Sequence, residues 1–176
     1  MLLDGLVIPL DPKSYRERHF SGHISGGQLS LPPEEMMLPD PVAVEITVAR
    51  ANNDQWRISG TLVYKGQYVC SRCLESFGRE QNSPIDRLFC VGSDPARNHK
   101  VRSLEDDQTF LPSGELAIQD LVREELLLDL PMIPVCSDDC CGLCPQCGCN
   151  RNHERCQCED NTREGPFSRL KEMKLS

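Results

Sequence analysis

Eleven cysteines in a chain of 176 residues constrain its fold more than any other feature of the sequence. Cysteines at this density form either disulfides in an oxidising compartment or metal sites in a reducing one. The segment from Met1 to Pro9 contains an acidic residue and no basic one, and its apolar run is too short for a secretory signal or a membrane span. We therefore expect a cytoplasmic protein that has no membrane contact and whose cysteines bind metal.

Eight of the cysteines have the spacing of metal ligands. Two cysteines separated by two residues can bind one tetrahedral ion, because the backbone between them makes a tight turn whose amides point at sulfur. Among these eight cysteines such pairs occur twice, and the second pair is followed by a permissive glycine, Gly148. We predict two structural zinc ions with four thiolates each. The first quartet is Cys70, Cys73, Cys136 and Cys140, and the second is Cys144, Cys147, Cys156 and Cys158.

Other partitions of these ligands stay open at this point. One zinc-ribbon site could use Cys70, Cys73, Cys144 and Cys147 and leave the other cysteines as satellites. An iron–sulfur cluster also takes four thiolates, although knuckle spacing favours zinc.

Four residues near these motifs receive a simpler interpretation. Cys90 falls in an apolar strand, where a small core residue is expected. Cys141 and Cys149 adjoin proposed ligands, so they could replace a ligand or be exposed to oxidation. His153 lies in the second cysteine loop and is interpreted as a solvated residue.

Alternating apolar residues predict an antiparallel β-meander in the first half of the chain. Val44, Ile46 and Val48 share one face of a strand, and a second alternating run begins at Trp56 after the turn at residues 52–54. Residues 85–91 read as a further strand, and residues 2–8 as a stretch that opens a sheet. The polar residues 93–112 are expected to form a loop.

One helix is predicted at about residues 114–130. Ser113 is the expected N-cap, apolar residues recur at helical spacing, and Pro131 prevents continuation. The acidic residues of this helix are interpreted as its solvated face and not as catalytic groups; they are Asp120, Glu124, Glu125 and Asp129.

These elements define an α+β fold with a small antiparallel sheet or partly closed barrel, one helix in the C-terminal half and a zinc-stapled module. We expect residues 1–134 to form the core, residues 135–160 to form a cysteine-rich module joined to the 70–73 knuckle, and residues 161–176 to form a basic tail. The sequence has no nucleotide-binding or hydrolase motif. A zinc ion held by four thiolates has no open position, so an enzyme is not expected.

The formal net charge of −8 is unevenly distributed. Residues 57–102 sum to +4 and residues 103–162 to −10, and the chain ends in a basic segment. An RNA contact would therefore use the basic residues of the middle and the tail. The candidates are Lys65, Arg72, Arg79, Arg87, Arg169 and Lys171.

Several segments together resemble the bacterial YceD family, the large ribosomal RNA subunit accumulation proteins. The segments are 69–75 (Val-Cys-Ser-Arg-Cys-Leu-Glu), the helix 120–131, the cysteine-rich 134–148, Cys156-Gln157-Cys158 and 165–171 (Gly-Pro-Phe-Ser-Arg-Leu-Lys). Cys141 and Cys149 depart from the family pattern, in which a basic residue and a small or polar residue are more usual. The resemblance implies a non-catalytic role in accumulation of large-subunit (23S) ribosomal RNA and in ribosome assembly.

Three functions follow as hypotheses. The first is a factor that contacts ribosomal RNA or a large-subunit precursor. The second is an acidic, zinc-containing adaptor that binds basic ribosomal proteins or another partner. The third is a thiol or metal sensor, which only the additional cysteines support.

Overall fold

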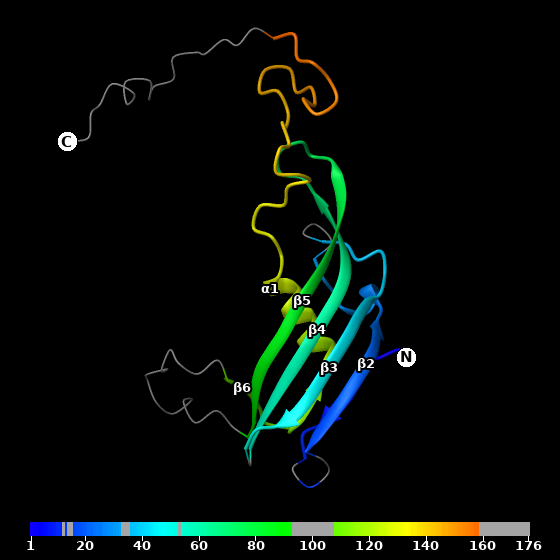
Figure 1. Ribbon diagram of the computed structural model, residues 1–176, viewed down its shortest axis with the longest axis vertical. Coiled ribbons are helices and arrows are strands. Elements are labelled where there is room, and N and C mark those ends of the chain that lie inside the picture. The colour runs from blue at the N-terminus through cyan, green and yellow to red at the C-terminus, as the bar shows by residue number, and fades with distance from the viewer. Residues whose placement is uncertain (12, 14–15, 33–35, 53, 93–107, 159–176) are drawn as a thin grey trace, which may run out of the picture.

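The computed structural model describes residues 1–158 apart from 12, 14–15, 33–35, 53 and 93–107. Its main feature is a five-stranded sheet with the strand order β2-β3-β4-β5-β6 (Figure 1). Every neighbouring pair is antiparallel except β5 and β6, which are parallel. The strands are β2 (Glu17–Ile24), β3 (Val42–Arg50), β4 (Gln55–Val69), β5 (Ser76–Val91) and β6 (Gln108–Leu111).

One face of this sheet carries the hydrophobic core. A two-stranded sheet of β1 (Val7–Pro9) and β7 (Glu115–Ala117), the helix α1 (Ile118–Leu128) and the short 3-10 helix Gly26–Gln28 contribute to the covering layer. The period-two pattern explains the burial, because alternate side chains of a strand point to the same face. The largest fully buried side chains include Trp56, Ile46, Ile58, Leu62, Ile118 and Leu126.

The predicted fold class, mainly β-sheet with one helix and cysteine clusters, is confirmed. The sheet is open and not closed into a barrel, and it is mixed because β6 runs parallel to β5. β6 falls inside 93–112, which the sequence predicted as a loop, and residues 93–107 of that segment lie outside the described residues.

The helix begins later than predicted. Glu115–Ala117 pairs with β1 as a strand, so α1 starts at Ile118 and Ala117 takes the N-cap position. Ser113 therefore does not cap the helix, and its hydroxyl instead accepts a hydrogen bond from the backbone amide of Glu115. Pairing with β1 satisfies the backbone of residues 115–117 and outweighs their local preference for a first helical turn.

Strands β4 and β5 form a long hairpin that extends beyond the end of α1 (Figure 1). Val69 pairs with Ser76 at its closed end, which places residues 70–75 at the tip. After α1 the chain continues along the hairpin toward that tip. The two cysteine-rich segments, residues 70–73 and residues 136–158, both lie at this end of the molecule (Figure 1). The hairpin thereby brings Cys70 and Cys73 to residues more than sixty positions later in the sequence.

The end of the helix is fixed to the hairpin by hydrogen bonds to Asp129. Its Oδ2 atom accepts from Tyr64 Oη at 2.5 Å, from Gln81 Nε2 at 3.3 Å and from the Ser83 hydroxyl. About one helical turn earlier, four residues before Asp129, Glu125 forms an ion pair with Arg87 at 2.5 Å, with both side chains largely buried. Assignment of Glu125 and Asp129 to the solvated helix face was therefore wrong, because β5 supplies partners for both.

Candidate metal centres

The first cysteine knuckle closes the tip of the β4–β5 hairpin. The amide of Leu74 donates to the carbonyl of Cys70 at 2.9 Å, and Leu74 adopts a left-handed φ of 60°. The amides of Arg72 and Cys136 both point at the Cys70 sulfur, at 3.4 Å. A thiolate surrounded by backbone N–H groups is the arrangement that a metal-binding knuckle requires.

Cys136 and Cys140 complete a first cluster, together with Cys70 and Cys73. Their four sulfur atoms lie within 4.8 Å of one another, with Cys70 and Cys140 separated by 3.9 Å and Cys73 and Cys136 by 3.8 Å. Four sulfurs placed about 2.3 Å from a zinc ion would be about 3.8 Å apart at the corners of a tetrahedron. A disulfide requires about 2.05 Å, so the spacing suits a shared metal ion and not a cross-link.

The second knuckle repeats the geometry of the first. The amide of Gly148 donates to the carbonyl of Cys144 at 2.9 Å, and Gly148 has a left-handed φ of 75°, as Leu74 does in the first knuckle. The amide of Gln146 points at the Cys144 sulfur at 3.5 Å. Two similar turns therefore present two pairs of sulfurs, one on the hairpin and one on the cysteine-rich segment.

The second cluster consists of Cys144, Cys147, Cys149 and Cys156, whose sulfurs also lie within 4.8 Å of one another. Cys147 and Cys156 are 3.7 Å apart, and Cys156 and Cys144 are 3.2 Å apart. Cys149 thus stands where the sequence placed Cys158. Cys158 lies beside the cluster, and its amide donates to the Cys156 sulfur at 3.4 Å.

Sequence spacing contained a signal for Cys149. Cys147-Gly148-Cys149 and Cys156-Gln157-Cys158 are two C-x-C pairs, so each of the two cysteines follows a cluster member by two residues. Spacing alone therefore does not decide whether Cys149 or Cys158 is the fourth ligand. The folded turn at Gly148 brings Cys149 back toward Cys147, which a count of residues does not show.

Backbone amides lower the pKa of thiols in both clusters, including that of Cys147, on which the largest influence is the amide of Cys149. Burial alone would raise the pKa of Cys70, but amide groups of Cys73, Cys136 and Arg72 outweigh it and lower the pKa to about 6. The amides of Cys147 and Gln146 lower the pKa of Cys144 to about 6. Each cluster therefore contains at least one thiol whose lowered pKa favours the thiolate form that binds a metal ion.

We expect metal retention to depend on pH in the direction that these shifts set. Both pKa values lie below the ordinary thiol value of 9.0. The stabilisation that these two thiolates give the folded state is therefore complete above pH 9 and is lost as the pH falls through about 6. Metal ions compete with protons for thiolates. Release of bound metal to a chromophoric chelator should be slow at pH 7.5 and become markedly faster below about pH 6. A release rate that does not change over this range would contradict the role of these thiolates.

Contacts between the two modules fix them to each other and to the hairpin. The amide of Leu143 donates to the carbonyl of Arg72, and the Arg72 guanidinium donates to the carbonyls of Asp138 and Cys140. His153, which the sequence suggested as a solvated residue, contacts the carboxylate of Glu75 at 3.0 Å. Residues 70–75 at the hairpin tip thus contact the second cysteine-rich segment, residues 136–158, at several points.

The predicted RNA-contacting residues are spread over different environments. Lys65 is exposed on β4. Arg79 is exposed on β5, donates to the carbonyl of Val135 at 3.3 Å and lies over the ring of Phe77. Arg72 and Arg87 have the structural partners described above. Arg169 and Lys171 lie outside the described residues.

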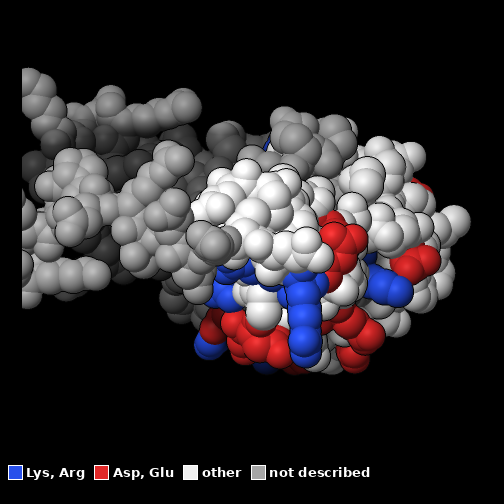
Figure 2. Space-filling view, turned by 90° about the horizontal axis from the view of Figure 1, so that it is seen from above, with Lys and Arg blue, Asp and Glu red and all other residues white. Residues whose placement is uncertain are grey.

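Charges of both signs alternate at the end of the molecule that carries the metal centres. Figure 2, which views the molecule from this end, shows Lys and Arg side chains next to Asp and Glu side chains. Arg72, for example, donates to the backbone carbonyl of the acidic residue Asp138 in this region. The described part of this surface is therefore a mixture of charges and not a single basic patch.

The remaining two cysteines stand apart from the clusters. Cys90 is buried in β5 with 6% of its surface exposed, next to Phe89 of the core. Cys141 is exposed, and its thiol points at the carbonyl of Asp139 at 3.6 Å.

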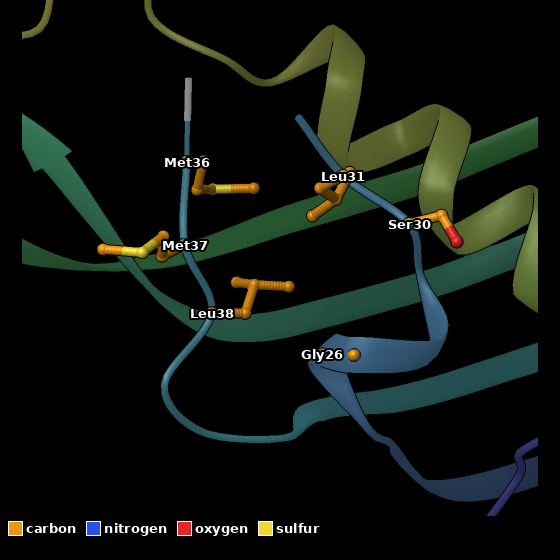
Figure 3. Close-up of a pocket in the computed structure, with 7 residues that line it drawn as sticks. Gly26, Ser30, Leu31, Met36, Met37 and Leu38 are labelled. Atoms are coloured by element: carbon orange, nitrogen blue, oxygen red, sulfur yellow. The ribbon is translucent and has the colours of Figure 1, made fainter. Parts of the chain in front are cut away.

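A shallow hollow beside the sheet lacks the groups that chemistry would need. It has a volume of about 220 Å³ and lies between residues 26–31 and residues 36–38 (Figure 3). Its lining residues are Gly26, Gly27, Ser30, Leu31, Met36, Met37 and Leu38, none of which is ionisable.

Over the described residues, no helix has both the length and the apolar character needed to cross a membrane.

The fold and its cysteine clusters define a class of protein: a small open β-sheet with one helix, whose longest hairpin carries two tetracysteine modules that can each hold a metal ion. Comparison with known proteins is specific about the family. The model of the family described as "Large ribosomal RNA subunit accumulation protein YceD" matches residues 58–174, and the chain belongs to this family. The resemblance inferred from the sequence is thereby confirmed.

Curated relatives are distant. The "Large ribosomal RNA subunit accumulation protein YCED homolog 1, chloroplastic" of Arabidopsis thaliana is 26% identical over 76% of this chain and 49% of that protein. An uncharacterised protein of Mycobacterium leprae is 26% identical over 61% of this chain and 48% of that protein. An uncharacterised protein of Mycobacterium tuberculosis is 30% identical over 52% of this chain and 42% of its own length. The chain spans about half the length of the curated relatives it matches, and no solved structure matches it.

Proposed function

We propose that this protein is a non-catalytic zinc protein that supports accumulation of large-subunit ribosomal RNA and assembly of the large subunit. Membership of the YceD family is the observation that carries this proposal. The name of the Arabidopsis relative supports it. A reducing compartment such as the cytoplasm is the setting in which eleven thiols stay available to metal.

Zinc is the ion that best fits the two clusters. Four sulfur donors at tetrahedral spacing are typical of structural zinc, and four thiolates leave no coordination position for a reactive water. The first ion would join the hairpin tip to the chain after α1, with Cys70, Cys73, Cys136 and Cys140 as ligands. The zinc ions would thus shape a surface and take no part in a reaction.

The RNA contact that we propose uses basic side chains near the hairpin tip and in the tail. Lys65 is exposed and is not needed for the metal centres, whereas the charge of Arg87 is already neutralised by Glu125. Arg72 and Arg79 donate to backbone carbonyls, which leave their positive charge uncompensated. Because two hydrogen bonds of Arg72 hold residues 138 and 140 on the hairpin tip, we choose Lys65, Arg79, Arg169 and Lys171 as the candidates for phosphate contacts.

Charge reversal in cells tests this function. In a strain that lacks the protein, the ratio of large-subunit to small-subunit ribosomal RNA should fall, and the native chain should restore it. The variant Lys65→Glu/Lys171→Glu should fail to restore the ratio, because reversed charges repel phosphates. Lys13→Glu/Arg16→Glu is the matched control, with the same change in net charge on exposed residues near the start of β2.

Two outcomes would decide against parts of this proposal. An unchanged ribosomal RNA ratio in the strain without the protein would refute the assembly role itself. Full restoration by Lys65→Glu/Lys171→Glu would refute the RNA contact and leave the assembly role standing. The zinc content of each purified variant should equal that of the native chain.

A protein-binding adaptor is the second candidate function, and one observation favours it. Leu128, at the end of α1, and Met132 and Ile133, between the helix and the first centre, have 69%, 99% and 70% of their surface exposed. Exposed apolar side chains close together in sequence commonly mark a protein contact. Binding of purified basic ribosomal proteins in the absence of RNA, abolished by Met132→Ser/Ile133→Ser, would support this role over direct RNA contact.

A further inference from the structure

Five thiols surround the second centre, although a tetrahedral ion takes four. The cluster contains Cys144, Cys147, Cys149 and Cys156, and Cys158 lies directly beside it. The thiols of Cys147 and Cys156 are the two that interact most with Cys149 and with Cys158 alike. Both cysteines therefore lie next to the same two ligands, and a tetrahedral ion has room for only one of them.

The first centre differs, because it has four thiols and no competitor. Cys141 is adjacent to Cys140 in sequence, but its thiol points at the carbonyl of Asp139 and is exposed. Its amide donates to Asn152 Oδ1 at 2.8 Å, which fixes the backbone in this orientation. The presence of a fifth thiol is thus a property of the second centre alone among the described residues.

The backbone holds both competing residues independently of which thiol binds the ion. The carbonyl of Cys149 accepts a hydrogen bond from the Cys144 amide at 2.9 Å, and the amide of Cys158 donates to the Cys156 sulfur. Each cysteine follows a fixed ligand by two residues. An exchange of one thiol for the other would therefore take place next to a ligand that stays in the site.

We propose that Cys149 and Cys158 are alternative fourth ligands of a single metal ion at the second centre, so that loss of either one leaves a complete four-thiolate site. This inference rests on the proposed zinc centre. Exchange needs no oxidant, since the incoming thiol loses its proton as the departing thiolate gains one. The exchange also changes where the chain leaves the metal, after Cys156 in one state and after Cys158 in the other.

Single and double substitutions in the full chain test the proposal. Native protein should contain about two zinc ions per chain, and Cys141→Ser is the matched control that should retain both. Cys149→Ser and Cys158→Ser should each also retain about two, whereas Cys149→Ser/Cys158→Ser should retain about one. Substitution with cobalt(II) gives a second readout, because both single variants should keep the absorption of a tetrathiolate site with undiminished intensity.

Each contrary result identifies what has failed. Loss of an ion, or of the tetrathiolate spectrum, from only one single variant would show that its cysteine is an obligate ligand, and would overturn the proposal. Two ions in the double variant would also overturn it, since another donor would then complete the site. Fewer than two ions in the native chain would instead refute the pair of zinc centres on which the proposal rests.

Discussion

Replacing Cys70 by serine is expected to abolish metal binding at the first centre and to detach the chain after α1 from the hairpin tip. Cys70 is fully buried, and its sulfur accepts from the amides of Arg72 and Cys136 while facing Cys140 at 3.9 Å. A structural zinc site contributes binding free energy on the order of 10 kcal/mol, which is lost with the ion. Metal content should fall by one ion per chain, and amide hydrogen exchange of residues 134–143 should increase by orders of magnitude.

Comparison variants separate this effect from general damage. Cys147→Ser should remove only the ion of the second centre, because its exposed sulfur belongs to that cluster and not to the first. Cys90→Ala should keep both ions, since Cys90 is buried in β5 away from both clusters. The sheet should stay folded in all three variants, because its core does not include the metal ligands. Global unfolding of Cys70→Ser, or loss of an ion from Cys90→Ala, would contradict this division.

Asp129→Ala should lower the free energy of unfolding by about 3 kcal/mol, the second largest effect that we expect. Asp129 accepts from Tyr64, Gln81 and Ser83, and its removal leaves the buried Tyr64 and Ser83 and the partly buried Gln81 without this acceptor. Burial, followed by the hydrogen bond to Asp129, raises the pKa of Tyr64 above its ordinary value, so the phenol stays a neutral donor at every physiological pH. Denaturant unfolding followed by tryptophan fluorescence of Trp56 provides the measurement.

Two variants control for charge and helix propensity. Asp129→Asn retains one acceptor oxygen and should cost less than the alanine variant. Asp120→Ala removes an exposed carboxylate from the same helix and should change the stability by less than about 0.5 kcal/mol. Equal effects of Asp129→Ala and Asp120→Ala would show that the hydrogen bonds to the hairpin contribute nothing. A loss of metal with Asp129→Ala would further show that this anchor positions the first centre.

The positions of the basic residues show why a count of charges along the sequence does not identify an RNA-contacting surface. Arg87 belongs to the +4 segment of the sequence, yet its charge is used to pair Glu125 beneath the helix. Reversing Arg87 would place two carboxylates together in a largely buried site and destabilise the fold. Lys65 lies on β4, the strand that also carries Arg57, and its side chain is exposed. It is therefore suitable for a test of RNA contact.

Local patterns in the sequence determined the elements that depend on neighbouring residues. Period-two alternation predicted β3 and β4, and apolar spacing up to Pro131 predicted α1, because a strand or helix face is set by residues within one or two turns of each other. The C-x-x-C motifs predicted two knuckles for the same reason. Only the tertiary structure decided the rest. Parallel pairing of β6, the partners of Asp129 and Glu125, and the approach of Cys149 to the second cluster all join residues whose distance in space the sequence does not contain. These contacts form when the chain has collapsed around its core, where burial and hydrogen bonding select one arrangement among several that the local sequence allows equally.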